Sequence, residues 1–309
     1  MYYYTACCVE KTRIFSSDIE LYKKQQYKGV CAMFFDMDVL VDYARAGVPT
    51  PETKAKMNCF LLPSRPELPW QQEKPLVIVC PGGGYHFLSE RESEPIAMRF
   101  LAAGMHAVIL RYHVAPARYP TAALELAWCI QECRRHAAEW HVRPDQIYIA
   151  GFSAGGHLCC TVGTTWDWDV FHQALDSDVS WRPDGQILSY PVVTLGEYTH
   201  MGSRENLLGD KATDEAWLKK LSLENQVTEK TVPTFLWHTM DDELVPVENS
   251  LQYAAALRKA GVPFEMHIYE SGPHGLATCD MTTATEKRKP APDCANWMEM
   301  AIRFIQRRG

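Results

Sequence analysis

The sequence predicts an α/β fold in which a mostly parallel sheet is covered by helices on both faces. From about residue 56 onward, short apolar runs alternate with longer segments of helical periodicity. A helix between two strands returns the chain to the starting edge, which favours parallel pairing and burial of both sheet faces. The 309 residues can bury a substantial core, and 47% apolar with 22% charged residues is typical of globular proteins.

Seven short apolar runs are expected to form the strands, because each has strand length and is bounded by turn or helical segments. They span 57–62, 76–80, 106–110, 146–150, 186–190, 234–238 and 264–269. The segments with helical spacing span 94–103, 121–140, 155–165, 247–260 and 293–307. Segment 166–185 carries three tryptophans and lacks periodicity. We expect it to be a small insertion over the carboxyl end of the sheet, where ligands bind in open α/β folds.

The chain divides into two parts in this interpretation. Residues 1–55 have no clear periodicity and are expected to form an N-terminal extension of uncertain structure, whereas residues 56–309 form a single domain. No repeat or linker interrupts the second part.

Charge and composition exclude several classes of partner. The formal net charge of -7 and a pI near 5.9 give no reason to expect nucleic acid. No run approaches 18 apolar residues and no secretory signal is legible, so we expect no membrane association and a cytoplasmic location.

The eleven cysteines do not indicate a metal site or a disulfide framework. The sequence has no C-x-x-C, and the adjacent pairs Cys7-Cys8 and Cys159-Cys160 are poorly spaced for tetrahedral zinc. An odd count in a chain that can build its own core argues against disulfides. We expect buried thiols at Cys80, Cys129 and Cys160, and no bound metal.

The stretch AGFSAGGHL at residues 150–158 holds a serine between glycines. A G-x-S-x-G match arises by chance in about one chain in ten of this length, and Ser153 could be an ordinary loop residue. Its context is more specific, because the predicted strand 146–150 runs into the motif and a predicted helix follows it. This strand–turn–helix arrangement is the one a nucleophilic serine requires.

A base and an orienting acid are available downstream of Ser153. His274 lies in SGPHG, an irregular loop after the last predicted strand. Asp241 and Asp242 follow strand 234–238, where an acid can reach a loop histidine, although either could merely precede a helix. The order Ser, Asp, His is a known order for such a triad.

The stretch CPGGGY follows the predicted strand 76–80 and can supply backbone N–H donors. Its alternative interpretation is a flexible glycine loop. A phosphate-binding loop is excluded because G-x-x-x-x-G-K-[ST] is absent. A dinucleotide site is also excluded, since Phe87 stands where the third glycine of G-x-G-x-x-G should be.

Together these motifs resemble the α/β-hydrolase family, and within it the bacterial acetyl esterases that act on carbohydrates, related to acetylxylan and feruloyl esterases. The resemblance covers about residues 55–308. Its stretches are PGGGYHFLSERESEPIAMRFLAAG, LRYHVAPARYP, IYIAGFSAGGHL, FLWHTMDDELVPVENSL and SGPHGL. Many relatives have histidine where this chain has Pro81, and residues before 50 match nothing in the family core.

The resemblance implies a role for each motif. Ser153 would be the nucleophile, His274 the base and Asp242 the acid, with Asp241 as the alternative. The oxyanion hole would be formed by N–H groups of three residues, namely Gly83, Gly84 and Ala154.

The implied activity is two-step hydrolysis of acetyl or other short-chain esters, on carbohydrates such as xylo-oligosaccharides, without cofactor or metal. An aromatic shelf for a sugar ring could be formed by Tyr85, His86, Trp166 and Trp168, although tryptophans serve equally well in a core. Three alternatives remain open: a general carboxylesterase or lipase, a serine peptidase, and a non-enzymatic binding protein. The expected partner is a small-molecule or oligosaccharide ester, and the sequence predicts no oligomeric state.

Overall fold

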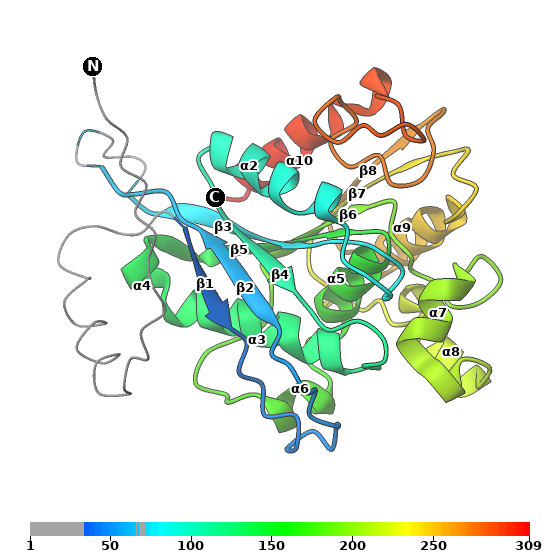
Figure 1. The fold of residues 1–309 in the computed structure, drawn as a ribbon, viewed down its shortest axis with the longest axis horizontal. Coiled ribbons are helices and arrows are strands. Elements are labelled where there is room, and N and C mark those ends of the chain that lie inside the picture. The colour runs from blue at the N-terminus through cyan, green and yellow to red at the C-terminus, as the bar shows by residue number, and fades with distance from the viewer. Residues whose placement is uncertain (1–33, 66, 68–71) are drawn as a thin grey trace, which may run out of the picture. The chain divides into compact units, whose positions relative to one another are not determined.

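The computed structural model describes residues 34–65, 67 and 72–309, and within them the strands form one twisted sheet (Figure 1). The spatial order is β1-β2-β4-β3-β5-β6-β7-β8. The strands are β1 (Phe34–Asp38), β2 (Lys56–Phe60), β3 (Lys74–Cys80), β4 (His106–Arg111), β5 (Val142–Phe152), β6 (Gly185–Ser189), β7 (Thr234–Thr239) and β8 (Phe264–Tyr269).

Most of the sheet is parallel, as the sequence predicted. Strand β2 pairs antiparallel with β1 and with β4, whereas every pair from β4 to β8 is parallel. Each of the seven predicted runs overlaps a strand, and β5 is longer than expected because it spans Val142–Phe152. The carboxyl ends of β3, β5, β6 and β7 therefore meet at one edge of the sheet.

The sheet begins earlier in the chain than the predicted domain boundary. Strand β1 pairs with β2 from Phe34↔Phe60 to Asp38↔Lys56, so residues 34–38 belong to the sheet and the boundary at residue 55 is too late. Its side chains alternate between exposed and half-buried, as expected for an edge strand. The remainder of the predicted extension, residues 1–33, lies outside the described residues.

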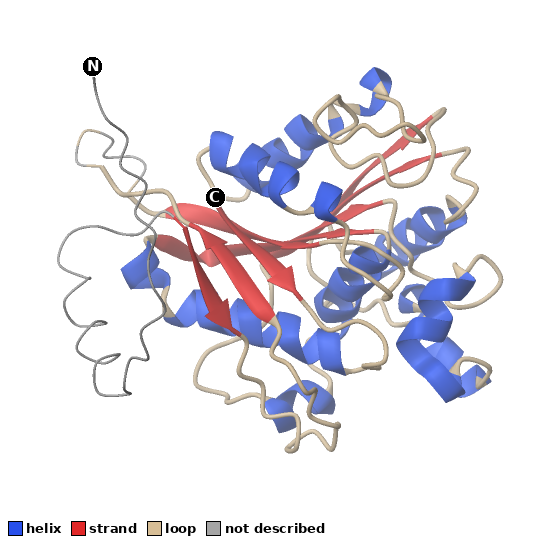
Figure 2. Cartoon of the chain, in the orientation of Figure 1, coloured by secondary structure: helices blue, strands red, loops and turns tan. Residues whose placement is uncertain are grey.

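Helices cover both faces of the sheet (Figure 2). Figure 1 shows α2 and α10 on one side and α3 and α5 on the other. The helices are α2 (Glu94–Ala102), α3 (Thr121–Arg135), α4 (Ala137–Trp140), α5 (Ala154–Thr165), α6 (Asp169–Ala174), α7 (Met201–Leu208), α8 (Glu215–Leu221), α9 (Glu248–Ala260) and α10 (Trp297–Gln306). The predicted helix over 121–140 is divided at His136 into α3 and α4.

The core on the α2 and α10 side packs aromatic side chains of α10 against β5 and β7. Trp297 of α10 stacks on Trp237 of β7 with ring centroids 5.1 Å apart, and packs edge-on against Phe152 at 5.9 Å. These three side chains are fully buried, and each contributes about 1.5–3 kcal/mol of hydrophobic stabilisation. Phe152 precedes Ser153, so this packing fixes the strand end that carries the serine.

Segment 166–185 does not lie over the carboxyl edge of the sheet, contrary to the prediction. Helix α5 begins at that edge, and its 12 residues carry the chain about 18 Å towards the opposite edge. Segment 166–185 includes α6, follows α5 and ends at the start of β6. Just before β6, the backbone N–H of Asp184 donates to the carbonyl oxygen of Ile147 at 2.9 Å. The small insertion beside the site is instead segment 190–225, which contains α7 and α8.

The described cysteines are free and buried, which confirms the expectation for Cys80, Cys129 and Cys160. Cys7, Cys8 and Cys31 lie outside the described residues. Across the described part of the chain, none of the helices has the length and apolar character needed to cross a bilayer.

Candidate active site

Ser153 lies on a sharp turn between β5 and α5. Its backbone has φ 53° and ψ -118°, a conformation that a residue with a side chain adopts only when its surroundings enforce it. The flanking glycines make this turn possible. A Cβ at Gly151 would lie 2.2 Å from the carbonyl oxygen of Gly155, and one at Gly155 would lie 2.1 Å from that of Cys80. The G-x-S-x-G pattern is therefore a requirement of backbone packing here.

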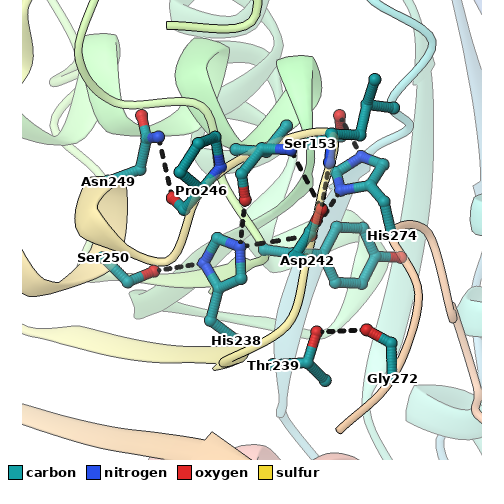
Figure 3. Close-up of polar contacts among 12 residues, drawn as sticks. Ser153, His238, Thr239, Asp242, Pro246, Asn249, Ser250, Gly272 and His274 are labelled. Carbon is teal, nitrogen blue, oxygen red and sulfur yellow. Dashed lines mark hydrogen bonds and ion pairs between the residues drawn. The ribbon is translucent and has the colours of Figure 1, made fainter. Parts of the chain in front are cut away.

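Three of the predicted side chains form one hydrogen-bonded chain (Figure 3). His274 Nε2 lies 2.8 Å from Ser153 Oγ, and His274 Nδ1 lies 2.7 Å from Asp242 Oδ2. A carboxylate only accepts, so Nδ1 carries the proton and Nε2 accepts from the serine hydroxyl. Ser153 is 7% exposed to solvent and the His274 side chain is 9% exposed, so the reacting atoms are largely buried but accessible.

Asp242 is held by more than His274. Its Oδ1 accepts hydrogen bonds from the backbone N–H groups of Leu244 (3.0 Å) and Val245 (2.9 Å). Burial disfavours the charged carboxylate, but the hydrogen bonds from His238 and His274 outweigh it and hold the pKa of Asp242 well below its ordinary value. Asp242 is therefore ionised at neutral pH, as an acid that orients a histidine must be.

Asp241, the alternative acid, points elsewhere. Its carboxylate accepts from Ser271 Oγ and from the backbone N–H of Gly272, both at 2.7 Å. It therefore fixes the start of the loop that carries His274 and does not contact the imidazole.

His238 is a residue of this site that sequence reasoning missed. The ring is fully buried at the end of β7, with Nε2 3.3 Å from Asp242 Oδ2 and 2.9 Å from the carbonyl oxygen of Val245. Both neighbours accept, so Nε2 carries the proton and Nδ1 accepts from Ser250 Oγ at 2.8 Å. Figure 3 shows His238 and His274 on two sides of Asp242. Nothing in the sequence distinguishes His238 from an ordinary buried strand histidine.

The glycine loop lies against Ser153. A Cβ at Gly82 would be 3.0 Å from Ser153 Cβ, which places the loop beside the nucleophile. The amide N–H groups of Gly83 and Gly84 donate no hydrogen bond to any described residue. Ala154 is the first residue of α5, where an amide has no partner within the helix. The three predicted oxyanion donors are thus free backbone amides in the loop and at the turn that flank Ser153.

His200, at the start of α7, is a second histidine that the sequence did not single out. Its Nδ1 accepts from the backbone N–H of Ser203 (3.2 Å), and its Cε1 would lie 3.5 Å from a Cβ at Gly84. Burial and the charge of His274 lower the pKa of His200, so the ring is neutral with its proton on Nε2. No described residue accepts from that Nε2–H.

Helix α7 is also tied to the loop, since Asn206 Nδ2 donates to the carbonyl oxygen of Gly84 at 3.0 Å. The insertion therefore fixes the outer end of the glycine loop.

Tyr85 is an internal residue and not part of a sugar-binding shelf. Its side chain is 3% exposed, and its hydroxyl lies 3.0 Å from His157 Nδ1. Burial lowers the pKa of His157 to about 4, so this imidazole is neutral and donates through Nε2 to the carbonyl oxygen of Leu221. His86 is exposed on the glycine loop, and its substrate contact stays a prediction.

Trp166 and Trp168 do not come near Ser153, which corrects the expectation of a four-residue shelf. Trp166 caps the far end of α5, and its Nε1 donates to the carbonyl oxygen of Lys230 at 3.1 Å. Trp168 lies beneath the Lys220 ammonium at 5.2 Å. Within the described residues, no group of three or more His, Cys, Asp or Glu could hold a metal ion.

The comparisons agree with the predicted fold and family. A model of the BD-FAE family matches residues 67–257. Endo-1,4-beta-xylanase B of Butyrivibrio fibrisolvens is 38% identical over 208 residues, which are 66% of this chain and 33% of that protein. An acetylxylan esterase of Xylanibacter ruminicola is 33% identical over 230 residues, 72% of this chain and 44% of that protein. The chain thus spans less than half the length of these curated relatives.

A solved structure extends the likeness over nearly the whole chain. The acetyl ester-xyloside bifunctional hydrolase of Caldicellulosiruptor lactoaceticus superposes with a TM-score of 0.76 at 33% identity, covering 91% of this chain and 99% of that one. The resemblance inferred from the motifs is confirmed. The chain belongs to the BD-FAE family and has the α/β-hydrolase fold.

Proposed function

We propose that the protein is a serine esterase that hydrolyses short-chain esters, in particular acetyl esters of carbohydrates such as xylo-oligosaccharides. The observation that carries this proposal is the hydrogen-bonded chain from Ser153 Oγ through His274 to Asp242, flanked by free backbone amides. A hydroxyl with a base in hydrogen-bond contact, and an acid behind that base, is the arrangement of an activated nucleophile.

In the first step His274 Nε2 takes the proton of Ser153 as Oγ attacks the ester carbonyl carbon. The amides of Gly83, Gly84 and Ala154 stabilise the developing oxyanion, and each such donor contributes about 2.7–4 kcal/mol. His274 then protonates the departing alcohol, which leaves an acyl group on Ser153. Water activated by the same imidazole releases the acid, while Asp242 stabilises the imidazolium in both steps.

The substrate class rests on the relatives. Two of the curated relatives bear the names of a xylanase and an acetylxylan esterase, and the superposed structure bears that of an acetyl ester-xyloside bifunctional hydrolase.

The test is hydrolysis of p-nitrophenyl esters from acetate to octanoate by the wild type, Ser153→Ala and the exposed control Ser180→Ala. We expect acetate to be the best substrate, no turnover by Ser153→Ala and unchanged turnover by the control. Release of acetate from acetylated xylo-oligosaccharides is then measured, and p-nitrophenyl xyloside, which has a glycosidic bond and no ester, is assayed in parallel for xylosidase activity. A preference for octanoate would favour a general carboxylesterase or lipase, and equal rates with Ser153→Ala would refute the serine mechanism.

A further inference from the structure

A buried carboxylate connects three segments of the site, and the mechanism above does not use it. Glu92 is 3% exposed and lies at the end of a short 3-10 helix, Glu90–Glu92, after the glycine loop. Its Oε2 accepts from the backbone N–H of Gly82 at 2.9 Å, and its Oε1 accepts from Tyr190 Oη at 2.7 Å. Each carboxylate oxygen therefore accepts a hydrogen bond from a different segment of the site, the glycine loop and the residue after β6.

Tyr190 carries the connection to the histidine. Its hydroxyl accepts from the backbone N–H of Ala277 at 3.0 Å, three residues beyond His274, so its own proton goes to Glu92. Its ring packs edge-on against the His274 imidazole, with centroids 5.1 Å apart and planes at 72°. Burial and the charge of Glu92 raise the pKa of Tyr190 well above its ordinary value, so the phenol stays protonated.

The backbone of Tyr190 is strained. Its φ is 38°, in the left-handed region that bulky residues rarely adopt, and its N–H donates to the carbonyl oxygen of Trp237 at 2.8 Å. Such strain persists only where the surroundings over-determine the conformation. Here the surroundings are Glu92, Trp237 and His274, which tie the residue after β6 to the site.

We propose that Glu92 and Tyr190 are positioning residues that hold the oxyanion loop and the His274 loop in one fixed relation across Ser153. The proposal rests on the proposed function, because the position of the oxyanion donors relative to the base matters only if both act on the same ester. Gly82 lies against Ser153, so a shift of the loop moves the oxyanion donors away from the carbonyl they must meet. A displacement of about 1 Å at such a site can cost about a hundredfold in rate.

The chain contains a matched control for a purely structural role. Glu125 is also buried and accepts from a tyrosine hydroxyl, that of Tyr43 at 2.7 Å, and from a backbone N–H, that of His113 at 2.9 Å. Neither Glu125 nor Tyr43 contacts the residues assigned to catalysis. Glu125 has one further partner, His113 Nδ1 at 2.6 Å. The pairs Glu92–Tyr190 and Glu125–Tyr43 therefore share a buried carboxylate that accepts from a tyrosine hydroxyl and a backbone N–H, and they differ in the segments they connect.

The experiment compares Glu92→Gln and Tyr190→Phe with Glu125→Gln and Tyr43→Phe, measuring kcat, KM and Tm with p-nitrophenyl acetate. We expect kcat to fall about tenfold to a hundredfold in the first pair with KM changed less than about threefold, since the interaction lost acts on the transition state. The second pair should keep kcat within about threefold at a similar loss of Tm. Equal kcat losses in both pairs, or an unchanged kcat in Tyr190→Phe, would overturn the proposal.

A second readout does not depend on activity. Hydrogen exchange of the segments 82–89 and 274–279 is followed in wild type and Glu92→Gln, and we expect both segments to exchange faster together. A change confined to segment 82–89 would show that the carboxylate does not link the two loops, and the proposal would fall. If the wild type hydrolyses no ester, the proposed function fails, and exchange alone then decides whether the link exists.

Discussion

Replacing Asp242 by asparagine tests how this site fixes the tautomer of His274. Asp242 Oδ1 accepts two backbone N–H bonds, from Leu244 and Val245. In Asp242→Asn the amide oxygen must take that position, because an NH₂ group there would face two donors. The new NH₂ group then occupies the Oδ2 position and points at His274 Nδ1, which must accept instead of donate. The imidazole proton therefore moves to Nε2, where it faces the Ser153 hydroxyl.

The magnitude follows from this inverted tautomer. His274 can no longer accept the proton of Ser153, and the loss of an orienting aspartate with retained geometry lowers kcat about ten-thousandfold in a serine hydrolase triad. This corresponds to about 5.4 kcal/mol at 1.36 kcal/mol per factor of ten. The variant should stay folded because asparagine has the same shape as aspartate.

The neighbouring acid supplies the control. Asp241→Asn removes a carboxylate one residue away that binds Ser271 and Gly272, so kcat should fall less than about fivefold. The assay is steady-state hydrolysis of p-nitrophenyl acetate at neutral pH, with circular dichroism to confirm folding. A kcat for Asp242→Asn within tenfold of wild type, or equal losses of kcat in the two variants, would show that Asp242 does not fix the tautomer of His274.

Three further predictions concern other parts of the site. Gly155→Ala places a Cβ 2.1 Å from a backbone oxygen and should lower the free energy of unfolding by about 3 kcal/mol in urea melts. Gly196→Ala, at an exposed position where the Cβ meets only the Thr194 hydroxyl oxygen at 3.3 Å, should change it by less than about 1 kcal/mol. Trp166→Ala and Trp168→Ala should leave kcat/KM on acetylated xylo-oligosaccharides within about twofold, and a larger loss would return them to the substrate site. His200→Ala removes a free donor beside Gly84 and should raise KM about tenfold, so an unchanged KM would remove His200 from substrate binding.

The order of the motifs along the chain predicted that a serine, an acid and a histidine would meet, without selecting the acid. Ser153, Asp242 and His274 each follow a strand, and the carboxyl ends of parallel strands share one edge, so sequence separation does not prevent contact. The choice between Asp241 and Asp242 was made by resemblance alone. In the structure it depends on which side of the turn after β7 faces the imidazole, which no periodicity encodes.

The position of segment 166–185 was predicted wrongly because its composition does not indicate an edge of the sheet. An aromatic stretch without periodicity looks the same at either edge of a sheet. The direction of the chain would have located it, because the helix after a strand returns the chain to the amino edge. His238, His200 and Glu92 had no signal at all, since their roles depend on contacts between segments far apart in sequence.

Covalent trapping shows whether Ser153 is the nucleophile. The wild type is treated with diethyl p-nitrophenyl phosphate, a reagent that phosphorylates activated serines, and the modified peptide is identified by mass spectrometry. We expect one phosphoryl group per chain on Ser153, complete loss of esterase activity in step with labelling, and at least hundredfold slower labelling in His274→Ala. Labelling of a different residue, or full labelling of Ser153 with ester hydrolysis intact, would contradict this role of Ser153.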